Sequence, residues 1–400
     1  MKKLFVLAAV ALVATSAHAG EMKWSGAADW RYDQTKYDDQ IGTTSSTSAT
    51  QNSQQTVKQH EIKASLGVNG GWENVEYGIG LRTQTATNNA YVNMSSTDLA
   101  VGIDQAFVKY SHDFSVLDLA ATLGRQKNVF AYEGSSQLLF SNDDRFNGLG
   151  WNFKLGSFGL NAAQYVLGSD GTGTNSKVTT TNSVAANLSM LYGFQPYMNW
   201  RFTDEIDAFL GIGYYSWNNL SNATGNTGNG GFDDTTYNSN ATAASTLAIG
   251  SLHQWQFTTN VNLPYSLAFG GEYITNKAGN YVKSGVQGAK VGDNSAWTAG
   301  LSYGKVKKAH DWSLSYYYAS KGIDSVLSSY SNVLFPADNK GHIIEAKYNL
   351  ADNFHIGAEF LMLKAKSNMN GAGTLYTASG TSNSQQEKSS YWEVNAGVAF

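Results

Sequence analysis

The 400-residue sequence is poor in the features that stabilise small secreted or soluble domains. It contains no Cys and only three Pro, and charged residues make up 14% of it, whereas soluble proteins usually carry about 25%. Without Cys no disulfide framework can form, so hydrogen bonds must supply rigidity in an oxidising compartment. The formal net charge is −4, with no basic stripe along the chain, which argues against nucleic-acid binding.

Long hydrophobic runs are also missing. A membrane-spanning helix needs about 20 apolar residues, and no run of 18 follows Ala19. At the start, Lys2 and Lys3 precede eleven apolar residues, Leu4 to Ala14, and then an Ala-x-Ala site, Ala17-His18-Ala19. This order predicts a signal peptide over residues 1–19, with an uncleaved anchor as the alternative. A lipoprotein anchor is excluded, because no Cys follows the cleavage site.

The sequence is instead rich in glycine, aromatic residues and alternating patterns, with 41 Gly, 23 Tyr, 18 Phe and 10 Trp. In the last ten residues, apolar Trp392, Val394 and Phe400 alternate with Glu393 and Asn395. This period of two is typical of a strand with one apolar face. For an exported chain without a spanning helix, a closed barrel is the remaining way to satisfy every backbone group in lipid. We therefore predict an all-β transmembrane antiparallel barrel over residues 20–400.

Similar alternating stretches recur along the chain and are joined in turn by short turns and long polar loops. The predicted strands lie near residues 22–34, 62–68, 75–81, 106–110, 117–123, 149–155, 158–162, 186–200, 206–214, 255–261, 267–273, 297–303, 312–318, 344–350, 354–364 and 391–400. Sixteen strands enclose a water-filled channel. Strand counts of 14 and 18 are the alternatives. Since short turns face the periplasm in such barrels, the termini are expected there. The long extracellular loops are expected near residues 35–55, 85–101, 127–146, 168–183, 219–247, 276–294, 324–340 and 366–388.

Local signals refine this topology. Asn69-Gly70-Gly71 between two alternating runs predicts a hairpin turn. Pro196 lies inside the eighth strand, and since proline cannot donate to a ladder, a bulge or a strand start is expected there. Six Trp residues near strand ends predict aromatic girdles at the membrane surfaces; they are Trp24, Trp151, Trp200, Trp297, Trp312 and Trp392.

Several segments carry a family resemblance. Leu123-Gly-Arg-Gln-Lys-Asn128, Leu138 to Asp144, and Phe146-Asn-Gly-Leu-Gly-Trp151 follow one another in order, and Leu267 to Asn276 and Asp338 to Glu359 add further matches. Together they resemble the putative porin family of Gram-negative outer membranes, over residues 100 to 400. The first quarter shows only the general barrel pattern. The resemblance implies a passive outer-membrane channel assembled as a homotrimer, but it does not identify the solute. We expect a porin for small hydrophilic solutes and ions, surrounded by outer-membrane lipid and lipopolysaccharide.

The channel constriction is expected in the third long loop. Residues 127–146 mix the charged Glu133, Asp143, Asp144 and Arg145 with apolar residues such as Leu138 to Phe140. Apolar side chains are unfavourable in a merely solvated loop, so we expect Leu138 to Phe140 to pack against the inner barrel wall. The acidic pair would then approach lumen-side cations, namely Arg31, Arg82 and Arg125, and opposed charges would select solutes. The alternative is that this loop caps the mouth or contacts a neighbouring subunit.

Other chemistry finds weaker support. Gly-x-Gly pairs at 78/80 and 211/213 lie within strands, not in a nucleotide-binding turn, and the seven His show no metal-ligand spacing. Asn142-Asp143-Asp144 and Asp233-Asp234 could contribute Ca²⁺ ligands, but solvated loops are the preferred explanation of both. A barrel enzyme using His253 or His342 with Ser251 or Asp338 has no supporting spacing. A structural or adhesion role is the other alternative, and no cofactor is expected.

The terminal aromatic residue has its own predicted role. Phe400 ends the closing strand and resembles the signal read by the barrel-assembly machinery, so we expect it to act in assembly.

Overall fold

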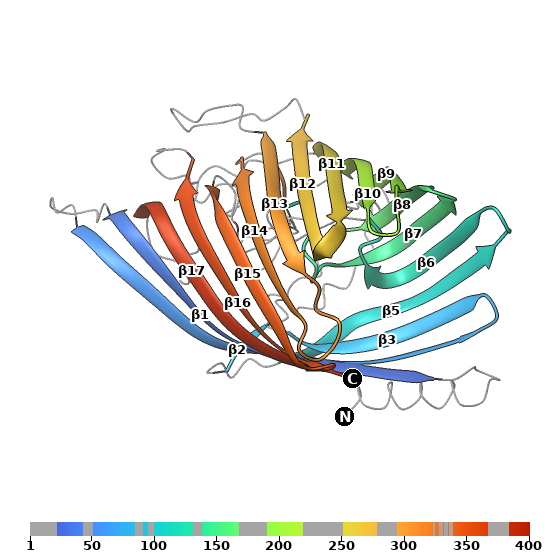
Figure 1. Ribbon diagram of the computed structural model, residues 1–400, viewed down its shortest axis with the longest axis horizontal. Coiled ribbons are helices and arrows are strands. Elements are labelled where there is room, and N and C mark those ends of the chain that lie inside the picture. The colour runs from blue at the N-terminus through green and yellow to red at the C-terminus, as the bar shows by residue number, and fades with distance from the viewer. Residues whose placement is uncertain are drawn as a thin grey trace, which may run out of the picture.

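The computed structural model describes residues 22–42, 51–84, 91–94, 100–130, 138–167, 190–218, 251–277, 294–322, 325–327, 331, 335, 339–366 and 384–400. Most of these residues belong to one antiparallel sheet that curves into a ring (Figure 1). Its strands are β1 Lys23–Gly42, β2 Gln51–Trp72, β3 Val75–Gln84, β4 Val92–Asn93, β5 Ala100–Asp113, β6 Asp118–Lys127, β7 Arg145–Leu155, β8 Phe158–Val166, β9 Met190–Arg201, β10 Asp207–Asn218, β11 Ser251–Leu263, β12 Leu267–Asn276, β13 Ser295–Gly304, β14 Trp312–Lys321, β15 Asn339–Ala351, β16 Phe354–Ala365 and β17 Ser384–Ala399. The proposed signal peptide, residues 1–19, lies outside the described residues and stays a prediction.

The sheet closes on itself, because β1 pairs with β2 on one side and with β17 on the other. The described part of the chain forms 17 strands. β4 has only two residues and pairs with Glu61 and Ile62 of β2, beyond the end of β3. Leaving out β4, sixteen strands form the barrel wall, which confirms the predicted architecture.

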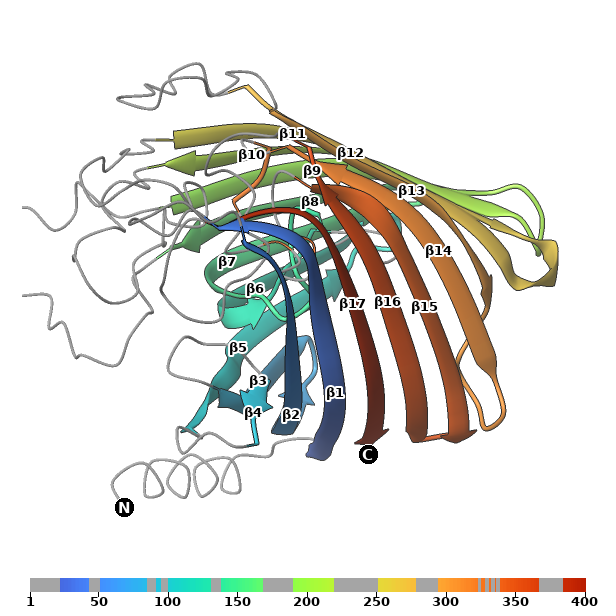
Figure 2. The ribbon, with the colours of Figure 1, turned by 90° about the vertical axis from the view of Figure 1, so that its left-hand side faces the viewer.

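Short and long connections lie at opposite ends of the barrel. The turns between paired strands are brief, as at residues 73–74, 156–157 and 352–353, and they lie at the end that also holds the C-terminus (Figure 2). Short turns face the periplasm in outer-membrane barrels, so this end is expected to be periplasmic and the opposite end extracellular. Among the described residues, no helix has the length and apolarity to cross a membrane.

Side chains alternate between an apolar outside and a mixed inside. On β10, Leu210 and Ile212 are exposed on the outer face, while Phe209, Tyr215 and Trp217 are buried inside. The aromatic side chains predicted to form girdles include Trp24, Trp200, Trp297 and Trp312, which are exposed near strand ends. The core therefore lies within the barrel, and the outer surface is the apolar one.

One predicted turn is wrong. Gly70 and Gly71 lie inside β2, where they pair with Tyr77 and Glu76 of β3, and the turn is formed by Glu73 and Asn74. Glu73 adopts a left-handed φ of 48°, which a tight two-residue hairpin requires. The glycines make room instead, because a Cβ at Gly70 would collide with the Tyr77 ring. The turn expected at Gly156-Ser157 is confirmed, with a φ of 59° at Gly156.

The first extracellular loop is shorter than the predicted range 35–55. β1 continues to Gly42 and β2 begins at Gln51, and the two remain paired up to these residues. Polar Ser, Thr and Gln residues are tolerated there because the backbone ladder can extend above the membrane without an apolar face.

Pro196 forms neither the bulge nor the strand start that was predicted. β9 continues through it, opposite Leu160 of β8. On the other side, the pairs Gly211–Tyr197 and Tyr214–Phe194 keep one register across the gap. The missing donor at Pro196 therefore interrupts the ladder with β10 locally without shifting it.

Candidate functional site

The described residues of the third extracellular loop, 128–130 and 138–144, lie inside the barrel. Leu138, Leu139 and Phe140 are each at most 2% exposed, as expected for apolar side chains that need cover. The Phe140 ring lies 5.2 Å from the Tyr215 ring and 6.0 Å from the Trp217 ring, centre to centre, on the inner face of β10. This packing fixes the loop to the inside of the wall, where aromatic rings contribute large buried areas.

A second aromatic contact anchors the start of the same loop. Phe130 packs edge-on against Tyr215 at 4.8 Å between ring centres. Its ring occupies the space above Gly193 of β9, where a Cβ would collide with it. The wall thus has a glycine where the loop approaches it most closely.

The charged end of the loop meets cations from the opposite side of the lumen. Asp143 accepts a hydrogen bond from the Lys63 ammonium of β2 at 2.8 Å. Arg82 of β3 donates to the backbone oxygen of Asp143 at 3.0 Å. Burial alone would raise the pKa of Asp143, but Lys63, Arg82 and Arg145 outweigh it and hold the pKa below its ordinary value.

Asp144 has a different role. Its carboxylate accepts a hydrogen bond from the Ser141 backbone N–H at 2.9 Å and so closes a tight turn. Burial raises the pKa of Asp144 well above its ordinary value, despite that hydrogen bond. Asp144 therefore contributes less negative charge than Asp143.

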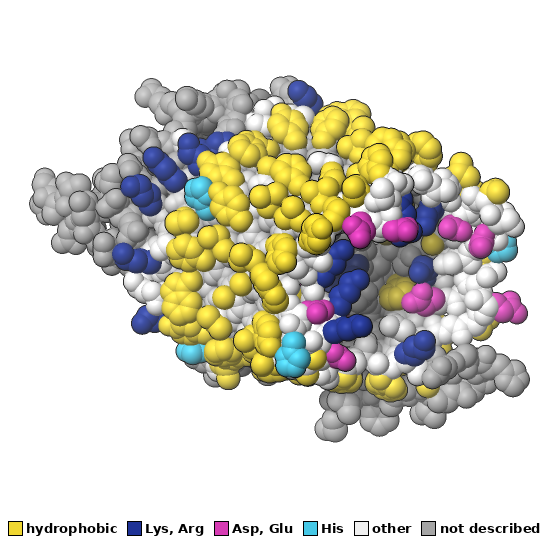
Figure 3. Space-filling model, viewed as in Figure 1, with side chains coloured by type: hydrophobic (Ala, Val, Ile, Leu, Met, Phe, Trp, Pro, Cys, Tyr) yellow, Lys and Arg dark blue, Asp and Glu magenta, His cyan; other side chains and the backbone are white. Residues whose placement is uncertain are grey.

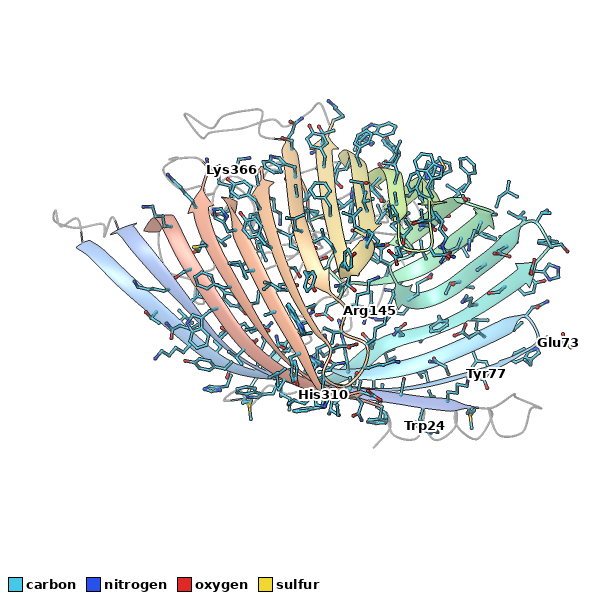
Figure 4. The ribbon with its side chains drawn as sticks, in the orientation of Figure 1. Trp24, Glu73, Tyr77, Arg145, His310 and Lys366 are labelled. Carbon is cyan, nitrogen blue, oxygen red and sulfur yellow. The ribbon has the colours of Figure 1, made fainter. Side chains whose placement is uncertain are left out.

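A β-bulge places the acid that pairs with the nearby arginines. The ladder between β3 and β5 shifts between Gly80 and Leu81, which pair with Gln105 and Ile103 and leave Asp104 as the extra residue. Bulges commonly re-aim a side chain. Here Asp104 lies 3.2 Å from Arg82 and 2.9 Å from Arg145, nitrogen to oxygen. Figure 4 shows Arg145 inside the ring of strands.

Arg31 lies in a neighbouring cluster. Its guanidinium forms an ion pair with Glu61 and lies 3.6 Å from Glu393. The Tyr91 ring connects this cluster to the loop, since its centre is 3.9 Å from the Arg31 guanidinium carbon and 5.0 Å from the Lys63 ammonium. Burial raises the pKa of the Tyr91 hydroxyl.

A row of carboxylates crosses the inner wall beside Arg31. Glu345 of β15 pairs with Glu359 of β16, Glu359 pairs with Glu393 of β17, and Glu393 pairs with Asp33 of β1. Like charges directly opposite one another destabilise a sheet. Four carboxylates thus lie on adjacent strands of the inner wall, and Arg31 lies close to two of them, Asp33 and Glu393.

A second loop also enters the lumen. Of the seventh loop, Val326, Leu327 and Phe335 are buried. The Lys321 ammonium of β14 donates to the Phe335 backbone oxygen at 2.8 Å, and Gln254 of β11 donates to the Ser325 oxygen at 2.7 Å. Sequence analysis gave this loop no role, although its apolar residues carry the same signal as Leu138 to Phe140.

Between the two loops the wall is lined by amides. Asn161 donates to Gln195 at 3.0 Å, Gln195 donates to Gln256 at 3.2 Å, and Gln256 donates to Glu272 at 2.6 Å. This chain of hydrogen bonds crosses strands β8 to β12 and fixes the orientation of polar groups in the lumen.

The remaining candidate residues are placed as follows. Arg125 donates from Nε to the backbone oxygen of Ile103 of β5 at 2.9 Å. Glu133, Asp233, Asp234 and Asp338 lie outside the described residues. His253 bonds to Tyr214 at 3.1 Å and His342 to Tyr316 at 2.8 Å. Each of these His side chains thus has a Tyr hydroxyl as its hydrogen-bond partner. Within the described ranges, no group of three His, Asp or Glu side chains is arranged to hold a metal ion.

Seen from its periplasmic side, the molecule is hollowed, and Lys, Arg, Asp and Glu side chains gather around the hollow (Figure 3). A closed sixteen-stranded barrel with an apolar outside and a charged inside that loop residues enter defines the class of outer-membrane channels.

Comparisons with known proteins agree with this class. Residues 29–252, more than half of the chain, match the family model described as "Putative porin", and the chain belongs to that family. The match includes the first quarter, where the sequence resemblance was only general. No curated protein matches the sequence.

Solved structures show the same fold. The high-pH structure of OprB from Pseudomonas putida has a TM-score of 0.58 at 9% identity, covering 95% of this chain and 94% of that chain. The outer membrane channel DcaP of Acinetobacter baumannii has a TM-score of 0.50 at 12% identity, covering 96% and 98%. The chain is therefore an outer-membrane porin.

Proposed function

We propose that this porin passes small hydrophilic solutes and ions by passive diffusion, with a preference for cations. The observation that carries the proposal is the carboxylate row on the inner wall, Glu345, Glu359, Glu393 and Asp33. An acidic row beside the path concentrates cations and repels anions, and Arg31 compensates part of the charge at Glu393 and Asp33. A barrel enzyme or an adhesin would need no such row across the lumen.

The experiment is single-channel recording in a planar bilayer. The purified protein should give stable conductance steps, and the zero-current potential in a KCl gradient should have the sign of cation preference. The triple variant Glu345→Gln, Glu359→Gln, Glu393→Gln should move this potential towards zero, because the row keeps only one of its four carboxylates, that of Asp33. A matched control, Asp204→Asn with Glu205→Gln, removes exposed acids from a periplasmic turn and should leave the potential unchanged.

The outcomes separate the two parts of the proposal. Absence of conductance steps from correctly folded protein would contradict the channel itself. Steps with a potential that the triple variant does not move would contradict the role of the row alone.

For the third loop we propose that Asp143 helps to set selectivity at the constriction. Asp143→Asn should shift the zero-current potential towards anions, because Lys63 and Arg82 lose the charge that compensates them. Asp144→Asn should shift it less, since the raised pKa of Asp144 reduces its charge and its carboxyl holds a turn. The measurement is the reversal potential of each single variant. Equal reversal potentials for wild type and Asp143→Asn would contradict the assignment of the third loop to the constriction.

The other partners in the sequence analysis also remain proposals. The homotrimer rests on the family resemblance, and light scattering of the detergent-solubilised protein would test it.

A further inference from the structure

Besides the third and seventh loops, the second long loop also reaches the lumen wall with its described residues, 91–94. Its short strand β4 lies beside β2 and pairs with Glu61 and Ile62, beyond the end of β3 (Figure 2). The Met94 backbone N–H donates to the His60 backbone oxygen at 2.8 Å. These backbone contacts fix this segment of the loop against the wall.

The same pairing decides where the Tyr91 side chain lies. Opposite residues of an antiparallel pair share one face of the sheet, and every second residue of a strand lies on that face. Glu61 is buried on the inner wall, so its partner Asn93 faces the lumen, and so does Tyr91 two residues earlier. Continuing the register by one residue brings Tyr91 opposite Lys63 of β2.

The Tyr91 ring contacts two cations of the lumen. Its centre is 3.9 Å from the guanidinium carbon of Arg31 on β1 and 5.0 Å from the ammonium nitrogen of Lys63. Both distances fall within the range of about 6 Å over which the negative face of an aromatic ring attracts a cation. One ring therefore holds two positive charges against the wall.

Lys63 is the cation that depends most on this contact. Arg31 has acidic partners of its own, since it forms an ion pair with Glu61 and lies 3.6 Å from Glu393. Among the described residues, the ion pair of Lys63 is with Asp143 at 2.8 Å, and the Lys63 side chain is still 24% exposed. A lysine ammonium is a point charge on a flexible four-carbon stem. Without the ring it would extend further into the solute path.

We propose that Tyr91 is a specificity-determining residue of the channel, whose ring holds the charges of Lys63 and Arg31 at the wall. The direction of its effect rests on the cation preference proposed above for the carboxylate row. Positive charge released beside the path would repel cations and attract anions. The second loop thus acts on selectivity together with the third loop, through the shared contact with Lys63.

The test measures the zero-current potential in a KCl gradient for two substitutions that separate the aromatic face from its hydroxyl. Tyr91→Leu keeps an apolar side chain without an aromatic face. It should lower the K⁺/Cl⁻ permeability ratio by about two- to fivefold, the factor that corresponds to one cation–π attraction at a partly exposed site. Tyr91→Phe keeps the aromatic face and should retain the wild-type ratio. The matched control is Tyr265→Leu, which removes an exposed ring from a short turn and should also behave like wild type.

A second comparison tests whether Lys63 carries the effect. Lys63→Met should raise the permeability ratio more in the Tyr91→Leu background than in wild type, because an ammonium group released from the ring contributes more positive potential to the path. Equal changes in the two backgrounds would overturn the role assigned to Lys63.

Heat-modifiable gel mobility and stable conductance steps establish that each variant is folded. A wild-type permeability ratio for folded Tyr91→Leu would overturn the proposal, and so would a ratio for Tyr91→Phe that falls as far as that for Tyr91→Leu. Failure of the proposed function is distinguishable, because it is read from the sign of the wild-type potential. The difference between Tyr91→Leu and wild type tests Tyr91 whatever that sign is.

Discussion

Replacing Leu139 and Phe140 together by Ala is expected to raise single-channel conductance, on the order of twofold, by releasing the third loop from the wall. Both side chains are buried against the inner face of β10 and its neighbours. Each truncation of a buried Leu or Phe costs about 2–5 kcal/mol of packing. Phe130 and Leu138 keep their buried contacts, but the middle of the loop loses its packing and should move away from the wall while the hydrogen-bonded wall stays closed.

The measurement is the conductance step size in a planar bilayer, with gel mobility as the test of folding. Leu210→Ala with Phe269→Ala is the matched control, because these side chains are exposed on the outer, lipid-facing side of β10 and β12. The control should conduct like wild type. A double variant at 139 and 140 that also conducts like wild type would show that the loop does not narrow the path.

Phe400→Ala is expected to lower the yield of folded protein in the outer membrane severalfold while changing the stability of purified barrels little. Phe400 and Gly26 exchange two backbone hydrogen bonds, 2.9 Å and 3.0 Å long, at the β1–β17 seam. An Ala residue keeps both bonds. Phe400 is 74% exposed. Replacing its side chain by Ala therefore removes little buried apolar area from the folded barrel, and the free energy of unfolding should change little. Its importance is therefore expected before closure, when the terminal strand is recognised.

Heat-modifiable gels of outer-membrane fractions measure the yield, and thermal unfolding of purified protein measures stability. Phe354→Ala removes an exposed aromatic ring from the periplasmic end of β16 and should assemble normally. Equal yields for wild type and Phe400→Ala would contradict the assembly role. A loss of stability in the purified barrel that matches the loss of yield would instead assign Phe400 a structural role in the seam.

Sequence patterns were sufficient for the barrel because the relevant physics is local. In lipid each strand must present an apolar side chain at every second residue, so alternation alone reveals strands, and short polar breaks reveal turns. The same local argument predicted that the side chains of Leu138 to Phe140 are buried. It also applied to Val326 and Phe335, whose burial it would have predicted.

Local rules failed where a signal has two physical uses. Asn69-Gly70-Gly71 has turn composition, but its glycines accommodate the Tyr77 ring within the strand. Pro196 was expected to distort β9, but one missing donor only interrupts a ladder that both neighbouring registers hold in place.

The charges of the site were decided by the tertiary structure. Lys63 and Asp143 are 80 residues apart in sequence and 2.8 Å apart in space, and the bulge at Asp104 is visible only in the β3–β5 register. Glu345, Glu359 and Glu393 are ordinary inward-facing acids until pairing places them side by side. The sequence by itself predicted a transmembrane barrel, with sixteen strands as the first choice and an inward third loop as one of two alternatives; the structure decided the strand number and placed Leu138 to Phe140 inside. Which charges meet depended on strand register and closure, because electrostatic energy depends on distances between residues that only the closed barrel brings together.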